Sequence, residues 1–128
     1  MAEKEIVRTE RAPAPFQGAP YNQAVKAAGL VFVAGQLGLV PGEKAPVDGI
    51  TAQTEQVLQN LRAILEEAGT GLDRLVKTTV FLQNLDDFAA MNEVYAAHVG
   101  EAPPARSTVE VAKLPSGALV EIEAVAVL

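Results

Sequence analysis

The strongest constraint on the fold of this chain comes from one amphipathic segment between residues 57 and 68. Its apolar residues recur at i, i+1, i+4, i+7, i+8 and i+11, and they are Val57, Leu58, Leu61, Ile64, Leu65 and Ala68. This spacing predicts an α-helix with a single apolar stripe, because residues three and four apart share one side of a helix. Asp48 or Thr51 can cap the start of the helix, and Gly69 can end it. Such a helix has to bury its stripe against another element.

The segments on either side of this helix predict strands. Two apolar runs flank the turn residues Ala27-Ala28-Gly29, and they predict a β-hairpin within residues 21–34. Residues 35–49 contain four Gly and two Pro, which is typical of a long connection. Residues 73–82 are rich in β-branched and apolar side chains, and they predict a central strand.

A second helix is predicted after Asn84, whose side chain can cap it. One face of this helix carries Phe88, Met91, Asn92, Tyr95 and Val99. The amide of Asn92 is the polar exception in this otherwise apolar stripe. Gly100 and the pair Pro103-Pro104 end the helix, because proline cannot continue it.

Two final strands are predicted over residues 105–111 and 119–127, and we expect them to form an antiparallel pair. Alternation along the first strand places Arg106 and Glu110 on one face. A simple register sets Glu110 near Glu121 and does not bring Arg106 to face Glu121. An Arg guanidinium can bind a planar carboxylate through two hydrogen bonds. A solvated edge or a structural Arg–Glu pair is the alternative interpretation of these charges.

The element order is therefore ββαβαββ, which predicts an α+β fold in a single domain over residues 1–128. Each helix has one apolar stripe, so we expect both helices on one face of the sheet. Apolar residues make up 49% of the chain, which is more than two helices can cover. We therefore expect the other sheet face to be buried by self-association.

Composition excludes several kinds of chemistry. The chain has no Cys and one His, which removes disulfides, thiolate zinc sites, iron–sulfur clusters, cysteine nucleophiles and His-based metal clusters. Sixteen acidic and ten basic residues give a net charge of −6. This balance argues against broad nucleic-acid binding, whose affinity comes from Lys and Arg neutralising phosphates.

The sequence predicts neither export nor membrane insertion. Residues 1–8 carry mixed charge and have no apolar run of the signal-peptide kind. The longest apolar stretch, from Gly29 to Gly35, is far shorter than the roughly 20 residues of a membrane helix. We expect a cytoplasmic protein with no membrane partner.

Several motifs together resemble a known family. They are Ala19-Pro-Tyr-Asn-Gln-Ala24, Val33-Ala-Gly-Gln-Leu37, Val76-Lys-Thr-Thr-Val-Phe81, Phe88-Ala-Ala-Met-Asn-Glu-Val-Tyr95, Pro104-Ala-Arg-Ser-Thr-Val-Glu-Val-Ala-Lys-Leu-Pro115 and Val120-Glu-Ile-Glu-Ala-Val125. Their order and spacing, from about residue 5 to residue 127, resemble those of the RidA/YjgF family of reactive-intermediate deaminases. The combination of motifs is highly specific.

This resemblance implies a fold, an assembly and an activity. The fold is a chorismate-mutase-like α+β sandwich, and the assembly is a homotrimer with a barrel of sheets and three ligand clefts between neighbouring subunits. The activity is the hydrolysis of small carboxylate enamines and imines to a 2-keto acid and ammonia. The substrates include 2-aminoacrylate, 2-iminopropanoate and 2-iminobutanoate, and the reaction needs no cofactor and no metal.

The resemblance also implies two catalytic residues. Arg106 matches the residue that clamps the substrate carboxylate. Glu121 matches the residue that holds and activates the attacking water. An arginine suits the first role because it stays protonated at all working pH values.

Five further positions match ligand contacts in the family. Tyr21 and Asn92 match contacting side chains, whereas Thr108 and Gly35 match backbone contacts in the cleft. Ala34 stands where the family commonly has Ser, so one hydroxyl is missing here. Its loss is worth roughly 0.5–1.5 kcal/mol, and we expect it to alter substrate preference or rate without abolishing activity.

Other functions stay open at the level of sequence. The main alternative is a protein that binds a small carboxylate, such as a 2-keto acid, without turning it over, and Ala34 favours this alternative. A translation-inhibiting endoribonuclease is disfavoured by the acidic balance and the lack of a His pair. Structural roles are expected for His98, as an exposed residue at a helix end, for Tyr95 and Met91 in packing, and for Lys77 as a solvated or inter-subunit charge.

Overall fold

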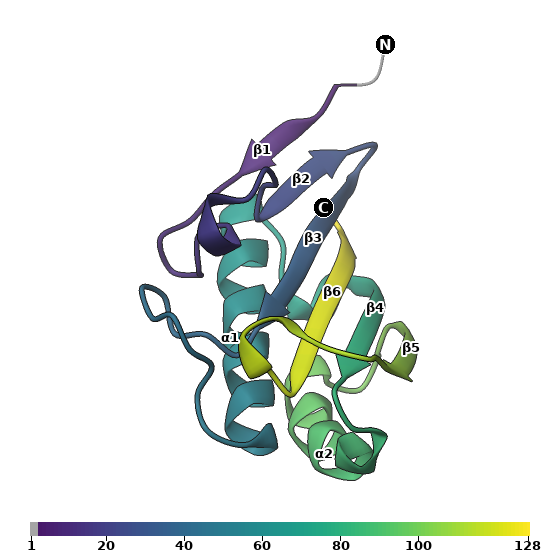
Figure 1. Ribbon diagram of the computed structural model, residues 1–128. Coiled ribbons are helices and arrows are strands. Elements are labelled where there is room, and N and C mark those ends of the chain that lie inside the picture. The colour runs from purple at the N-terminus through teal and green to yellow at the C-terminus, as the bar shows by residue number, and fades with distance from the viewer. Residues whose placement is uncertain (1–2) are drawn as a thin grey trace.

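A computed structural model describes residues 3–128, which form one mixed six-stranded sheet with two helices (Figure 1). The elements are β1 (Glu5–Val7), β2 (Ala24–Ala27), β3 (Leu30–Leu37), α1 (Ile50–Ala68), β4 (Leu75–Leu82), α2 (Phe88–Val99), β5 (Ala105–Glu110) and β6 (Val120–Val127). The strand order is β1-β2-β3-β6-β4-β5. The pair β4–β5 is parallel and the other pairs are antiparallel. The predicted α+β class is confirmed, and β1 is an addition to the predicted strands.

The predicted pairing of the last two strands is wrong. β6 lies between β3 and β4, whereas β5 lies at the edge of the sheet beside β4. The burial of these strands explains the order. Val120, Ile122 and Ala124 of β6 are buried, as a central strand requires, while β5 is exposed or half-buried along its whole length. Because α2 connects β4 to β5, these two strands run parallel, as is usual for a strand–helix–strand unit.

Helix α1 packs its apolar stripe against the sheet, as the sequence predicts. Val57, Leu58, Leu61, Ile64 and Leu65 are fully buried and form the main core with the helix-facing residues of β3, β4 and β6. Helix α2 lies on the same face of the sheet and adds Met91, Tyr95 and Val99 to this core.

The ends of the helices differ in part from expectation. Neither Asp48 nor Thr51 caps α1, because the N-cap is Gly49, whose φ of 90° suits a residue without a side chain. Gly69 ends α1 in the left-handed conformation, with a φ of 92°, as predicted. The side chain of Asn84 accepts a hydrogen bond from the backbone N–H of Asp86, and so it caps the short 3₁₀ turn that leads into α2.

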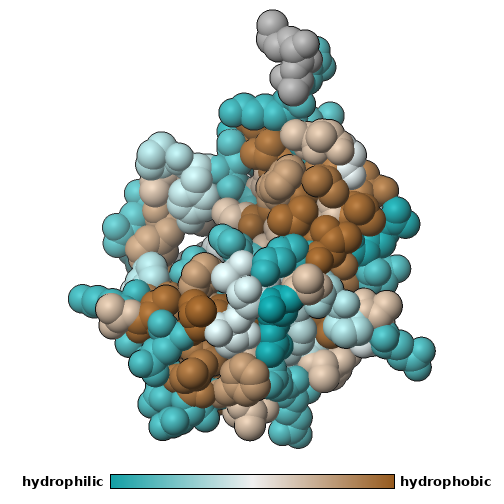
Figure 2. Space-filling model, turned by 90° about the vertical axis from the view of Figure 1, so that its right-hand side faces the viewer, coloured by the Kyte–Doolittle hydropathy of each residue, from teal (hydrophilic) through white to brown (hydrophobic). Residues whose placement is uncertain are grey.

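Loop residues cover one end of the opposite sheet face. They form a second apolar cluster of Leu37, Leu39, Leu114 and Ala118, with Phe16, Phe81 and Val111 packed around it. Elsewhere on this face Phe32 and Val109 are 45% and 43% exposed. Figure 2 shows that apolar residues gather in patches on the side of the molecule that faces the viewer. The face is therefore closed at one end and open at Phe32 and Val109.

His98 connects the two helices, so the expectation of an exposed residue is wrong. The guanidinium of Arg62 donates to Nδ1 at 3.2 Å, which assigns the ring proton to Nε2. Nε2 in turn donates to Oε1 of Glu55 at 2.9 Å. The hydrogen bonds from His98 and then Gln59 are the main causes that lower the pKa of Glu55 from its ordinary value of 4.5. Arg62 and Glu55 lie on α1, so the cluster holds α2 against α1.

We expect His98→Ala to lower the free energy of unfolding at pH 7 by an amount that shrinks in acid. The lowered pKa of Glu55 stabilises the fold above pH 4.5, and this stabilisation is lost as the pH falls through the lowered value. Denaturant unfolding of both proteins between pH 3 and pH 7 measures the difference. Glu55→Ala is the control, because His98→Ala in that background should show no such dependence on pH.

Candidate functional site

Four of the predicted site residues line one cavity. Tyr21, Ala34, Gly35 and Glu121 surround a space of about 350 Å³, together with Phe16, Ala19, Leu37 and Pro115. We call these four residues the carboxylate half-site. The cavity lies at the end of the sheet face that the second apolar cluster covers.

A β-bulge in β3 shapes the carboxylate half-site. The register of β3 against β6 shifts between Val33 and Gln36, and Ala34 and Gly35 occupy the shift. A Cβ atom on Gly35 would lie 2.1 Å from Oε2 of Glu121. Glycine is therefore required here because the carboxyl group of Glu121 lies directly against the backbone.

Glu121 itself is partly withdrawn from water. It lies on β6 opposite Leu37 of β3 and Phe81 of β4, on the sheet face away from the helices. Burial raises the pKa of Glu121 above its ordinary value, and the negative charge of Glu123 adds to the effect. The carboxyl group is therefore easier to protonate than a solvated glutamate.

Two turns of the same shape flank the cavity. Gln17 and Ser116 adopt left-handed conformations with φ of 55° and 56°, and each is followed by a glycine with a φ of 67°. Phe16 and Pro115, the residues before them, line the cavity. The hydroxyl of Tyr21 accepts a hydrogen bond from the backbone N–H of Phe16, which fixes the tyrosine beside the first turn.

The remaining three predicted site residues lie together elsewhere, and we call them the arginine half-site. Arg106 and Thr108 lie on β5 opposite Thr78 and Val80 of β4, on the face that carries the helices. Asn92 belongs to α2. Within residues 3–128, Oδ1 of Asn92 and Oγ1 of Thr108 are buried without a hydrogen-bond partner. Such groups are costly unless a ligand or water bonds to them.

Two aromatic residues of α2, Phe88 and Tyr95, lie beside Arg106, although the sequence predicts only a packing role for Tyr95. The Cζ atom of Arg106 lies 4.8 Å from the ring centre of Tyr95 and 5.5 Å from that of Phe88. The signal for this was present in the sequence, since Phe88, Asn92 and Tyr95 are spaced i, i+4 and i+7 along α2. Lys77 donates to Oγ of Ser107 at 3.1 Å, so it bonds to the neighbouring strand.

The two half-sites lie on opposite faces of the sheet of one chain. Arg106 pairs with Thr78, whose side chain is buried under the helices, while Glu121 pairs with Phe81, which points to the other face. Glu110 is not a neighbour of Glu121, because β4 lies between their strands; its Oε1 instead accepts from the N–H of Leu85 at 2.9 Å.

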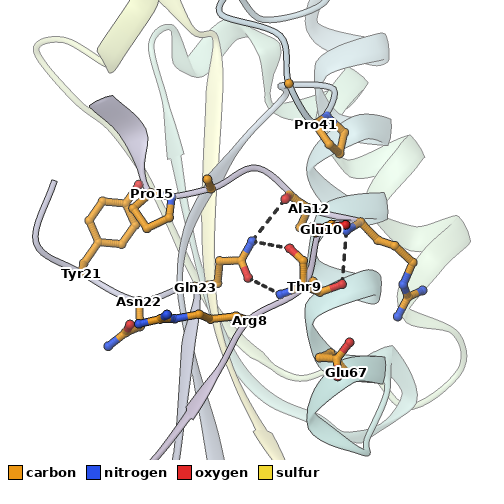
Figure 3. A pocket seen from close by; sticks show the side chains of 13 residues that line it. Arg8, Thr9, Glu10, Ala12, Pro15, Tyr21, Asn22, Gln23, Pro41 and Glu67 are labelled. Carbon is orange, nitrogen blue, oxygen red and sulfur yellow. Dashed lines mark hydrogen bonds between the residues drawn. The ribbon is translucent and has the colours of Figure 1, made fainter. Parts of the chain in front are cut away.

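A larger groove of about 850 Å³ adjoins Tyr21 (Figure 3). The buried amide of Gln23 is central to it: Oε1 accepts from the N–H of Thr9 at 2.7 Å, and Nε2 donates to the carbonyls of Thr9, Ala12 and Pro13. All polar atoms of this side chain are therefore used to fasten the segment before β2.

Two structural findings concern metals and membranes. Across residues 3–128, no three His, Asp or Glu side chains come close enough together to hold a metal ion. None of the helices in the same residues is long and apolar enough to cross a bilayer. The cytoplasmic location stays a prediction.

Comparison with known proteins identifies the family. The family model described as Endoribonuclease L-PSP matches residues 9–128. Reactive Intermediate Deaminase A, chloroplastic, from Arabidopsis thaliana is 48% identical over 126 residues, which cover 98% of this chain and 66% of that protein. The chain therefore belongs to the family that its motifs resemble, the RidA/YjgF family.

Solved structures of relatives have the same fold. RidA from the Antarctic bacterium Psychrobacter sp. matches with a TM-score of 0.92 and 44% identity, covering 97% of this chain and 99% of that one. E. coli TdcF, solved with bound serine, matches with a TM-score of 0.89 and 38% identity, covering 97% and 98%.

We expect Gly35→Ala to lower the pKa of Glu121 toward its ordinary value. The added methyl group occupies the place of the carboxyl oxygen, so the carboxyl group has to turn away from the backbone toward solvent. Side-chain carboxyl NMR shifts recorded across a pH titration measure the change. Gly71→Ala is a matched control, since its Cβ atom would crowd the carboxyl oxygen of Asp73 at 2.8 Å, away from the cavity. An unchanged Glu121 titration in Gly35→Ala would contradict the close approach.

Proposed function

We propose that this chain is an imine deaminase, which hydrolyses small 2-imino acids to 2-keto acids and ammonia. The substrates proposed are 2-aminoacrylate with its tautomer 2-iminopropanoate, and 2-iminobutanoate. The observation that carries the proposal is the pair of half-sites, one with a partly desolvated carboxyl group and the other with a guanidinium and two buried oxygens that lack hydrogen-bond partners. Family membership and the relative named Reactive Intermediate Deaminase A support the same reaction.

The proposed active unit is a homotrimer with its clefts between subunits. Arg106 and Glu121 act on one small substrate, yet they lie on opposite faces of the sheet. A head-to-tail ring joins the carboxylate half-site of one subunit to the arginine half-site of the next, and a closed ring leaves no half-site unused. The exposed apolar residues Phe32 and Val109 supply surface for such contacts.

Arg106 binds the carboxylate of the substrate in this mechanism. Its planar guanidinium matches a carboxylate with two parallel hydrogen bonds and keeps its charge at all working pH values. Within residues 3–128 no acidic side chain forms a salt bridge with Arg106, so its charge is available to an external anion. The relative solved with bound serine shows that a protein of this fold accepts an amino acid.

Glu121 handles the water and its proton. As a carboxylate it accepts a proton from the water whose oxygen bonds to the C=N carbon of the protonated imine, giving a carbinolamine. The protonated Glu121 then returns that proton to the nitrogen. As the C–N bond breaks, the carboxylate of Glu121 takes the proton of the carbinolamine hydroxyl, which gives the 2-keto acid, and the departing ammonia carries this proton away as ammonium. The raised pKa of Glu121 suits both steps, because it brings the group closer to the working pH.

The other half-site residues contribute contacts. The unpartnered amide oxygen of Asn92 is an acceptor, so it can accept from the substrate N–H groups or from a bound water, whereas the unpartnered hydroxyl of Thr108 can both donate and accept. Tyr21 and the backbone at Gly35 close the cavity beside Glu121. Ala34 lines the same cavity with a methyl group, and so this side of the cavity lacks a hydroxyl. The missing hydroxyl favours a second candidate function, which is the binding of a small carboxylate without turnover.

The direct test couples an amino-acid oxidase to the protein and follows imine loss and keto-acid release. We expect the wild type to accelerate imine loss. We expect Arg106→Ala to lower kcat/KM about 10- to 150-fold, because a charged hydrogen-bonded contact is worth about 1.5–3 kcal/mol. Lys113→Ala, which removes a positive charge from an exposed residue outside both half-sites, is the matched control and should leave kcat/KM unchanged. A wild type that binds 2-ketobutyrate without accelerating imine loss would favour the second candidate, and RNA cleavage that survives Arg106→Ala would contradict both.

Mixing inactive variants tests whether the site is shared between subunits. We expect Arg106→Ala and Glu121→Gln to be impaired alone and to regain activity when equal amounts are unfolded and reassembled together. Random assembly makes about three quarters of the trimers hybrid, each with one complete cleft of three, so about one quarter of wild-type activity should return. Each variant reassembled alone is the control. Mixtures that stay as inactive as their components would rule out a shared cleft.

A further inference from the structure

The surroundings of Arg106 show how its side chain is held. Phe88, Asn92 and Tyr95 recur at i, i+4 and i+7, so they follow one side of α2. The guanidinium lies over the two aromatic rings of this stripe, with its Cζ atom closer to the ring of Tyr95 at 4.8 Å than to that of Phe88 at 5.5 Å. Both distances are within the range of cation–π attraction.

Tyr95 is the more deeply buried of the two aromatic residues. It is 5% exposed, whereas Phe88 is 42% exposed. The Tyr95 hydroxyl is hydrogen-bonded to Oγ1 of Thr78 at 2.7 Å in the buried interior. Thr78 in turn lies directly opposite Arg106 in the β4–β5 pair. Strand pairing therefore sets the backbone of Arg106, and burial against the same strand holds the ring on which its side chain rests.

We infer that Tyr95 is a positioning residue for Arg106, which orients the guanidinium toward the carboxylate of a small 2-imino or 2-keto acid. The inference rests on the proposed function only in that Arg106 binds the substrate carboxylate. A guanidinium face that rests on an aromatic ring keeps its N–H edge free for the anion. An arginine ordered before binding loses less side-chain entropy when the anion arrives, and so the anion binds more tightly.

The ring and the hydroxyl of Tyr95 can be tested separately. Tyr95→Leu removes the ring, while Tyr95→Phe keeps it and removes the bond to Thr78. Tyr95→Phe leaves Oγ1 of Thr78 buried without a partner, a cost that the double variant Tyr95→Phe/Thr78→Val avoids. The double variant therefore keeps the ring and leaves no unpartnered hydroxyl at Thr78. We expect it to fold, so the role of the ring can be measured without the hydrogen bond.

We expect Tyr95→Leu to raise KM for the imine, and Kd for 2-ketobutyrate, about 5- to 30-fold with kcat nearly unchanged. The double variant should stay within about 2-fold of wild type. In the Arg106→Ala background, Tyr95→Leu should have no further effect on either constant. Val99→Ala, a buried change on α2 outside the aromatic pair beside Arg106, is the control for loss of stability and should leave KM and Kd unchanged.

A measurement on the free protein separates this inference from the proposed function. The Nε–H group of Arg106 should be ordered by ¹⁵N relaxation in the wild type and in the double variant, and mobile in Tyr95→Leu. If the wild type binds 2-ketobutyrate without turning over imines, the proposed function is wrong. The inference about Tyr95 is then tested by Kd and by the ¹⁵N relaxation of the Arg106 Nε–H group. The inference would be overturned if Tyr95→Leu changed KM and Kd equally with and without Arg106. It would also be overturned if the Nε–H group of Arg106 were equally mobile in the wild type and in all variants.

Discussion

The central position of β6 is the constraint on which the rest of the structure depends. β6 pairs with β3 on one side and β4 on the other, so its buried residues have to face the helices. The alternation of a strand then points Glu121 to the opposite face. β5 is displaced to the edge beside β4, where its own alternation points Arg106 toward the helices. One choice of strand order therefore separates the two charges that the proposed reaction needs together.

The sequence predicts the elements of this chain better than their pairing. The stripe of α1 is visible because burial imposes a period on the residues, and motif spacing identifies the family. The sequence predicts a pair of β5 with β6 because strands that are neighbours in sequence often form hairpins. This prediction is wrong because β6 is buried at the centre of the sheet by elements that are distant in the sequence. The predicted exposure of His98 is wrong for the same reason, because its partners Glu55 and Arg62 lie on another helix.

The site residues show the same division between local and distant information. The seven predicted residues fall into two half-sites, and this division follows from strand order and not from spacing. Arg106 is supported by Tyr95, which is itself bonded to Thr78, a residue of β4 that lies 17 positions from Tyr95. Asn92 is the one polar residue in the apolar stripe of α2, and its Oδ1 atom is buried without a hydrogen-bond partner within the described residues.

The placement of the half-sites on opposite faces has a consequence for the cell. On the proposed arrangement, a lone subunit holds all the residues of the reaction and none of the completed clefts. Catalytic capacity then rises more steeply than in proportion to protein abundance until the rings are fully assembled. On this arrangement the protein becomes active when its trimers assemble. Dilution that dissociates the trimers removes the activity without any chemical change in the subunits.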